Sequence, residues 1–355
     1  MTLRIASLVL AALLLWPGAA RGQTPATGAT PAADDDHVTR QIIPFLEGSY
    51  LYKSNEPHVI FAAAIYPHLM LWQNFDSLID ARRAKHVSEP PSWWKQYWAV
   101  SLTPGVRLKM SDAFSEPVRT PSYLPRADIQ KMMALGRPAA VRSLAAGRKT
   151  TLDLLEMHFA IEHHSNGQDG CLFVDQEVQT TDAATPKCVP DYSQRPQPGT
   201  VNKHDGNFST NEIRIGINLR RTDVAVSGQG TRHYGAGIEY QRQFATDPDL
   251  KPFYSEHRLN ANASIAWAGI RPCSSRVEAV FQVITAIDHP VPSVSRTATS
   301  VQLSCFPSIK GGFGAFVKAY WGQDPYNLGF LDNITRFQVG LTFNQDGIFK
   351  FRAAK

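Results

Sequence analysis

LEMHFAIEHHSNG, residues 155–167, alternates apolar and polar side chains with the period of a β-strand. Because successive strand side chains point to opposite faces, one face is an apolar stripe that ends in His163 and Ser165. The other face carries ionisable groups, namely Glu156, His158, Glu162 and His164. This pattern favours a strand whose apolar face meets lipid and whose polar face lines a barrel interior. A nucleophile and a base at the end of the stripe would then meet lipid.

A second segment, NEIRIGINLR at residues 211–220, places Ile and Leu on its odd positions and polar side chains on most even ones. If the two segments pair antiparallel with like faces together, Asn211 shares the face of His163 and Ser165. Cross-strand Cβ atoms lie about 4.5 to 5.5 Å apart, which brings Asn211 within hydrogen-bonding reach of the imidazole. The opposite faces are expected to combine as a charge-compensated interior lining, with Glu156, His158 and Glu162 near Arg214 and Arg220.

The chain begins with features of a secretory signal peptide over residues 1–22: a basic residue, an apolar run and a small-residue cleavage site. Residues 23–48 are interpreted as a flexible lead-in, 49–349 as the barrel domain and 350–355 as a C-terminal extension. No later apolar run approaches the roughly 20 residues that a membrane-spanning helix needs. Export without a helical anchor predicts either a soluble secreted protein or an outer-membrane barrel.

Net charge and cysteine content restrict the possible partners and the cellular compartment only weakly. The formal charge of +5 is partly contributed by the leader and gives little support to a nucleic-acid partner. The four cysteines suit an oxidising compartment. Of the three pairings that four cysteines allow, Cys171 with Cys188 and Cys273 with Cys305 is the favoured one.

Alternating segments recur along the chain, separated by turn residues, which is typical of an antiparallel transmembrane β-barrel. The alternative is a secreted sandwich, although its dry core would disfavour the polar faces. Residues 126–148, rich in Ala, Arg and Met, instead predict an external loop that carries a short helix. The expected strands lie at residues 59–66, 97–110, 234–241, 258–267, 277–283, 315–321 and 337–344.

Four sequence blocks resemble the bacterial outer-membrane phospholipase A, of the phospholipase A1 family. In chain order they are Ser115-x-Pro117-x-Arg119 with Tyr123-x-Pro125, His163-x-Ser165-Asn166-Gly167, Ser209-x-Asn211, and Tyr320-x-Gly322-x-x-x-Tyr326-Asn327. Together they extend over most of the mature chain and occur in the family's order. The resemblance implies a twelve-stranded barrel in the bacterial outer membrane. It also implies an ester hydrolase that cleaves phospholipids at sn-1 and sn-2, requires Ca2+ and is active as a homodimer.

The same resemblance implies roles for individual residues. Ser165 is the nucleophile, His163 the general base, Asn211 the residue that orients His163, and Gly167 the source of an oxyanion N–H. A serine needs such a base to remove its proton, and residues two apart on a strand have backbones about 6.5 to 7 Å apart. A neutral asparagine stabilises an imidazolium less than a carboxylate does. Donors aimed at the oxyanion, each worth about 2.7 to 4 kcal/mol, are therefore expected to matter.

The implied Ca2+ ligands are two backbone carbonyls and one side chain. These are the carbonyl of Glu116, donated across the dimer, the carbonyl of Gln168, and the side chain of Asn207, with Ser209 as a substitute. Two features depart from the family. The loop after Ser165 is longer and contains Cys171 and Cys188, and the residues flanking Asn211 are Thr210 and Glu212 instead of a tryptophan and a basic residue.

Two other functions remain open at this point. A catalytically silent barrel would serve as a pore or structural protein, and a soluble secreted esterase would need no membrane. A metal site formed by Glu156, His158, Glu162 and His164 is disfavoured, because alternation turns these side chains away from Ser165 and toward the interior.

Overall fold

The computed structural model describes the chain over residues 47–74, 96–112, 118–135, 150–174, 200–202, 206–224, 232–251, 253–267, 276–288, 294–307 and 312–343. All of these residues belong to one compact unit, residues 34–355. The signal peptide and most of the lead-in lie outside the described residues, so their boundaries stay predictions. Among the described residues, no helix is long and apolar enough to cross a bilayer.

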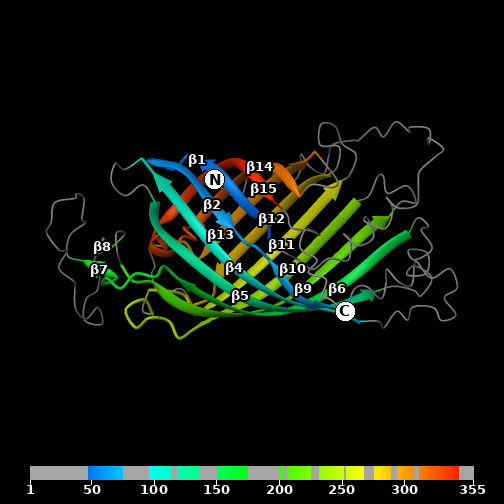
Figure 1. Ribbon diagram of the computed structural model, residues 1–355, viewed down its shortest axis with the longest axis horizontal. Coiled ribbons are helices and arrows are strands. Elements are labelled where there is room, and N and C mark those ends of the chain that lie inside the picture. The colour runs from blue at the N-terminus through cyan, green and yellow to red at the C-terminus, as the bar shows by residue number, and fades with distance from the viewer. Residues whose placement is uncertain are drawn as a thin grey trace. The chain divides into compact units, whose positions relative to one another are not determined.

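Within the described ranges, thirteen antiparallel strands form a single sheet (Figure 1). In chain order they are β1 (Ser49–Ser54), β2 (Val59–Ile65), β3 (Leu69–Gln73), β4 (Gln96–Ser111), β5 (Val118–Leu135), β6 (Thr150–Ser165), β9 (Ser209–Val224), β10 (Arg232–Phe244), β11 (His257–Trp267), β12 (Arg276–Ala286), β13 (Thr297–Phe306), β14 (Phe313–Gln323) and β15 (Asn333–Phe343). A separate two-stranded sheet joins β7 (Phe173–Val174) to β8 (Thr200–Val201).

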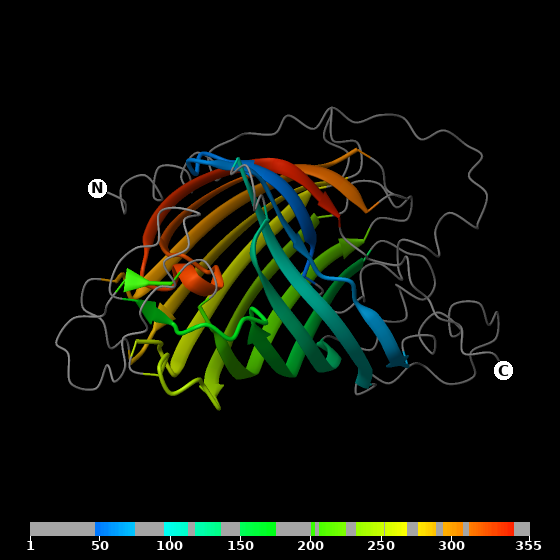
Figure 2. The same ribbon diagram turned by 60° about the vertical axis from the view of Figure 1, so that its left-hand side comes forward.

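The sheet closes on itself. Its order runs from β2 and β1 through β15 round to β4 and β3, and β2 also pairs with β4. Because β2 and β3 pair with successive parts of β4, they are two pieces of one barrel strand. Thirteen strands therefore make a barrel of twelve, as predicted, and Figure 2 shows the ring from an oblique direction.

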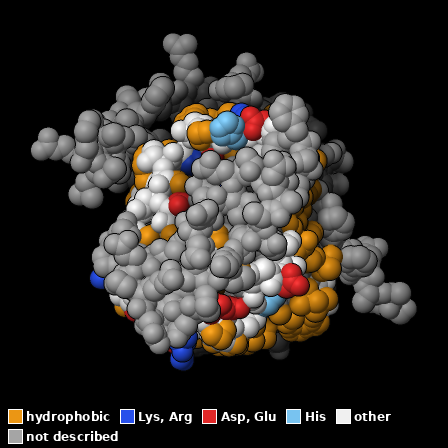
Figure 3. Space-filling view, turned by 90° about the vertical axis from the view of Figure 1, so that its left-hand side faces the viewer, with side chains coloured by type: hydrophobic (Ala, Val, Ile, Leu, Met, Phe, Trp, Pro, Cys, Tyr) orange, Lys and Arg blue, Asp and Glu red, His pale blue; other side chains and the backbone are white. Residues whose placement is uncertain are grey.

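The two faces of the barrel wall differ in polarity. Apolar side chains on the outer wall are exposed, among them Phe159, Ile161, Ile215, Ile217 and Leu219. Figure 3 shows such side chains in orange along the wall where described residues reach the surface. Their strand neighbours point inward and are polar and buried, as Glu156, Glu162 and Asn218 illustrate. This is the inverse of a soluble sandwich, which would bury its apolar face.

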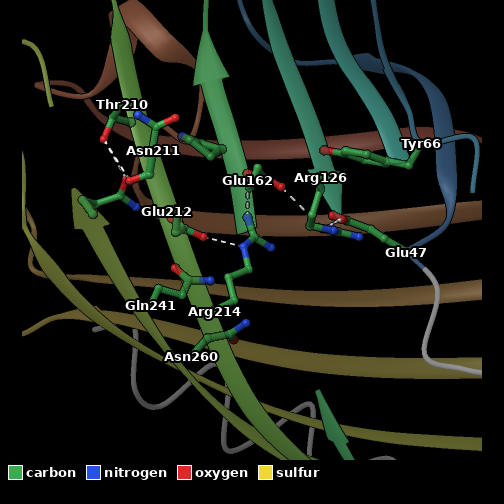
Figure 4. Close-up of polar contacts among 12 residues, drawn as sticks. Glu47, Tyr66, Arg126, Glu162, Thr210, Asn211, Glu212, Arg214, Gln241 and Asn260 are labelled. Carbon is green, nitrogen blue, oxygen red and sulfur yellow. Dashed lines mark hydrogen bonds and ion pairs between the residues drawn. The ribbon is translucent and has the colours of Figure 1, made fainter. Parts of the chain in front are cut away.

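Charged side chains pair inside the barrel (Figure 4). The guanidinium of Arg214 contacts Glu162 at 2.8 Å and also pairs with Glu212. Arg126 lies 3.0 Å from Asp128 and 3.5 Å from Glu162. The prediction that Glu162 meets Arg214 is confirmed. The carboxylates of Asp128, Glu162 and Glu212 are buried, so side chains fill this part of the interior.

An apolar cluster covers one end of the barrel, beyond the end of β6 and the start of β9. Its members come from the segments that connect strands at that end: Leu172, Phe173, Val201, Phe208, Leu250, Phe253, Tyr254, Leu328 and Phe330. In Figure 2 β7, β8 and the short 3-10 helix η2 (Asn327–Gly329) lie at this end. Burial of these side chains holds the connecting segments against the barrel.

The prediction of a loop with a short helix was wrong for Arg126–Leu135, which belongs to β5. Its backbone pairs with β4 on one side and β6 on the other. Asp128, Gln130 and Met132 point inward and are buried, whereas Ile129 points outward and is exposed. Pairing with two neighbours outweighs the helix propensity of Ala, Arg and Met, which is worth only tenths of a kcal/mol per residue. Residues 136–148 lie outside the described residues.

Candidate active site

The two strands that carry the predicted catalytic residues are direct neighbours. β6 and β9 pair antiparallel, with His163 opposite Asn211 and Ser165 opposite Ser209. On the other side of β6, Tyr123 lies opposite Ser165. The pairing inferred from alternation is therefore confirmed, and the register is the one that places Asn211 beside the imidazole.

His163 and Asn211 are joined by a hydrogen bond of 2.9 Å between Nδ1 and Oδ1. An amide oxygen accepts hydrogen bonds, so Nδ1 carries the hydrogen in this arrangement. Nε2 of the neutral ring then keeps its lone pair and is able to take a proton. Ser165, two residues further along β6, presents its hydroxyl on the same face of the strand.

This group lies on the outer wall of the barrel. Ile161 precedes His163 on the same face and is 46% exposed, and Phe244, opposite Asn211 on β10, is exposed as well. The alternate residues Glu162, His164 and Glu212 are buried on the interior face. His163, Ser165 and Asn211 are each partly exposed. The catalytic candidates therefore lie on the apolar outer wall and face the medium around the barrel.

Glu212, one of the two departures from the family pattern, points into the barrel. It pairs there with Arg214 and accepts a hydrogen bond from Gln243. Because its carboxylate is on the opposite face from His163, it belongs to the interior network.

A tight turn follows Ser165. Gly167 has a φ of +69°, in the left-handed region that glycine adopts without strain. A Cβ at this position would lie 3.4 Å from the ring of Tyr123, so the turn packs beside that ring. Gly167, the predicted oxyanion donor, thus lies two residues beyond Ser165 and is exposed, just past the end of β6.

Two of the three predicted calcium ligands are described, and both lie at the base of the long loop. The backbone N–H of Gln168 donates to Oδ1 of Asn166 at 3.3 Å. Asn207 is held on the other side, with its backbone N–H donating to the carbonyl of Gly170 at 2.7 Å. Glu116 lies outside the described residues, so its role stays a prediction.

Asp247 is a neighbour of this region that the sequence did not single out. The side-chain amide of Asn207 donates to Oδ2 of Asp247 at 2.8 Å, and the N–H of Asp247 donates to the carbonyl of Ser209 at 3.0 Å. No short-range motif marks Asp247, because only the β9–β10 pairing returns the chain to the start of β9.

A separate group of three side chains, of types that can ligate a metal ion, lies at the same end of the barrel. Ligand atoms of Glu256, His257 and Asp288 lie within 4.8 Å of one another. Burial raises the pKa of Asp288, but hydrogen bonds from Ser255 and from backbone N–H groups outweigh it and lower that pKa overall. Glu256 already pairs with Arg242 at 3.1 Å, so a cation there would compete with the guanidinium.

Cys171 and Cys305 are both disulfide-bonded. Their partners lie outside the described residues, so the pairings with Cys188 and Cys273 stay predictions.

Comparison by sequence finds no matching protein-family model and no matching curated protein. Comparison of structures finds outer-membrane phospholipases. The calcium-bound dimer of the Salmonella typhi outer membrane phospholipase is 12% identical, with a TM-score of 0.45, covering 90% of this chain and 100% of that one. For the Escherichia coli outer membrane phospholipase A, an active-site mutant is 12% identical at a TM-score of 0.46, covering 88% of this chain and 96% of that one. A further structure of the E. coli enzyme is 13% identical at 0.45, covering 86% and 98%. At these identities and TM-scores the likeness assigns no role to any residue of this chain.

Proposed function

We propose that this chain is a calcium-dependent phospholipase of the bacterial outer membrane that hydrolyses phospholipid acyl esters at both sn-1 and sn-2. One observation carries the proposal: the bond of 2.9 Å between His163 and Asn211 lies on the apolar outer wall, with Ser165 two residues away on the same face. In a bilayer this position meets the acyl chains and ester groups of the surrounding lipids. Soluble esterases have no need for such a wall.

In the proposed reaction, Nε2 of His163 removes the proton of the Ser165 hydroxyl as Oγ attacks the ester carbonyl. The imidazolium then returns this proton to the departing lysophospholipid oxygen, leaving an acyl-serine. Water attacks the acyl-serine with His163 again as base, releasing a fatty acid and restoring Ser165. Throughout, Asn211 holds the ring by its Nδ1–H, and the N–H of Gly167 donates to the oxyanion.

The residues at the base of the long loop fit a calcium ion. Ca2+ takes oxygen ligands such as carboxylates, amide oxygens and backbone carbonyls. Because Nδ2 of Asn207 is the atom that donates to Asp247, Oδ1 of Asn207 is the atom left for a cation. We propose that this oxygen, the carbonyl of Gln168 and the carbonyl of Glu116 from a second copy in a homodimer hold the ion. When bound, it would stabilise negative charge on the oxyanion.

A catalytically silent pore is not favoured. Buried ion pairs occupy the described part of the interior, and apolar side chains pack over one end of the barrel. Both features oppose an open aqueous channel, whereas neither hinders a site on the outer wall.

The test is fatty-acid release from labelled phospholipid by purified, refolded protein with calcium. Ser165→Ala is expected to abolish release while heat-modifiable migration of the barrel is retained. Ser300→Ala, which removes a buried interior hydroxyl on β13, is the matched control and should leave release unchanged. Chelation of calcium should abolish fatty-acid release by the wild type. Hydrolysis by Ser165→Ala at the wild-type rate, or no release by the wild type, would reject the proposal.

A further inference from the structure

Asn166, between the proposed nucleophile and the proposed oxyanion donor, uses nearly all of its hydrogen-bonding groups. Only 1% of the residue is exposed. Its Nδ2 donates to the carbonyl of Gly206 at 2.7 Å, and its Oδ1 accepts from the N–H of Phe208 at 3.1 Å and of Gln168 at 3.3 Å. Its own N–H donates to the carbonyl of Phe208 at 3.1 Å. A buried amide satisfied in this way is held in one orientation.

These bonds tie together the two ends of the long loop, residues 166–208. Asn166 belongs to the end that leaves β6, and Gly206 and Phe208 belong to the end that enters β9. A bridge between Gly170 and Gly206 adds a second tie. Gly206 has no room for a side chain, since a Cβ would lie 2.4 Å from the carbonyl oxygen of Asn202. The base of the loop is therefore closed tightly, next to Ser165.

The bond from the N–H of Gln168 to Oδ1 of Asn166 closes a ring around Gly167. Asparagine side chains that bond to the backbone two residues on form such turns and restrict the residue between. The direction of the Gly167 N–H is thus set by Asn166, and so is the position of the Gln168 carbonyl. Without the ring, a glycine at positive φ would be the least restrained residue of the turn.

Resting on the proposed function, we propose that Asn166 is a positioning residue. It aims the Gly167 N–H at the oxyanion and the Gln168 carbonyl at the ion, and it makes both independent of the long loop beyond. The rest of the long loop begins only after its two ends have been bonded together. Asn166 itself touches no reacting atom and acts through its two successors.

Two substitutions separate positioning from packing. Asn166→Leu keeps the volume and removes every side-chain hydrogen bond. Asn166→Asp keeps the acceptor for Gln168 and Phe208 and loses only the donor to Gly206. Asn202→Ala is the matched control, because Asn202 is also buried and its side-chain amide donates to the carbonyl of Cys171 at 3.1 Å.

For the refolded proteins with calcium, we measure kcat and KM on a phospholipid in mixed micelles. Asn166→Leu is expected to lower kcat about 100-fold, the effect of a misplacement of about 1 Å, with KM changed by less than about threefold. Asn166→Asp is expected to lower kcat only about tenfold, and Asn202→Ala to leave it within about twofold. A packing role predicts the reverse order, since a buried carboxylate is costlier than a leucine. That order, or an equal loss in Asn166→Leu and Asn202→Ala, would overturn the inference.

Hydrogen–deuterium exchange provides a readout that needs no activity. The amides of Gln168 and Phe208 should exchange faster in Asn166→Leu and stay protected in Asn202→Ala. If the wild type releases no fatty acid, the proposed function fails, and exchange still decides whether Asn166 restrains the turn. Unchanged protection in Asn166→Leu would reject the inference even in an active enzyme.

Discussion

The bond between His163 and Asn211 leads to a prediction whose size follows from the structure. Asn211→Ala removes the oxygen that accepts a hydrogen bond from Nδ1 of His163 at 2.9 Å, on the partly exposed outer wall. In the resting enzyme the bond joins two neutral groups and is worth about 0.5 to 1.5 kcal/mol. In the transition state the ring is an imidazolium, and a hydrogen bond to a charged group is worth about 1.5 to 3 kcal/mol.

The loss of transition-state stabilisation is therefore at most about 3 kcal/mol. The substitution also removes the bond of the resting state, so the decrease in kcat reflects the difference between the two states, about 1 to 1.5 kcal/mol, which corresponds to about 5- to 13-fold at 1.36 kcal/mol per factor of ten. Asn211→Asp keeps an acceptor and should retain more activity than Asn211→Ala. Because the side chain lies on the outer wall, folding should be little affected in either variant.

The assay is kcat for a short-chain phospholipid in micelles at saturating calcium, with heat-modifiable migration as the test of folding. Asn218→Ala, a buried interior asparagine on the same strand, is the control and should leave kcat unchanged. Full activity in Asn211→Ala would refute the orienting role. A loss as complete as that of Ser165→Ala would show that one hydrogen bond does not account for what Asn211 does.

Two further predictions concern the barrel. Ile217, near the middle of β9 and 48% exposed, faces lipid in this interpretation. Ile217→Arg should lower the free energy of unfolding in lipid by about 2 to 4 kcal/mol, whereas Ile217→Leu should leave it unchanged. Equal stability of the two variants would contradict a lipid-facing wall. Asp324, beyond the end of β14, lies 3.2 Å from Lys109 and 3.1 Å from Arg336. Burial raises the pKa of Asp324, but these cations lower it overall, so its contribution to stability is complete above the ordinary pKa and is lost as pH falls below it. In urea unfolding at pH 7, Asp324→Asn should lower the free energy of unfolding by about 3 to 5 kcal/mol. The difference in this free energy between variant and wild type should become smaller toward pH 3, and a constant difference would count against the ion pair.

Where alternation is strong, the sequence was sufficient to predict strands and their faces. In the segments 155–161 of β6, 213–219 of β9, 234–240 of β10 and 337–343 of β15 every second residue is apolar, and the structure turns those residues outward. The placement of His163, Ser165 and Asn211 on one outer face followed from the same period, because side-chain direction on a strand is a local property. The matching of faces between β6 and β9 was also accessible, since a slip by one residue would have turned every apolar side chain inward.

Weak or misleading local signals left other strands to the tertiary structure. The outward positions of β13 include Thr297 and Thr299, which reduce the contrast between its faces. Residues with high helix propensity led to a wrong prediction for the second half of β5, whose conformation depends on pairing with β4 and β6. Closure of the barrel through β2 and β4 depends on contacts between distant segments, which no short pattern encodes.

The sequence by itself thus determined which side chains face outward from the barrel and that His163, Ser165 and Asn211 share one outward face. Only the tertiary structure decided what supports them. The bonds of Asn166 across the base of the long loop and the contact between Asn207 and Asp247 join residues that are about 40 positions apart. The physical reason is that the alternation of a strand depends on residues adjacent in sequence, whereas hydrogen bonds between loops form only after the strands have paired and brought the loops together.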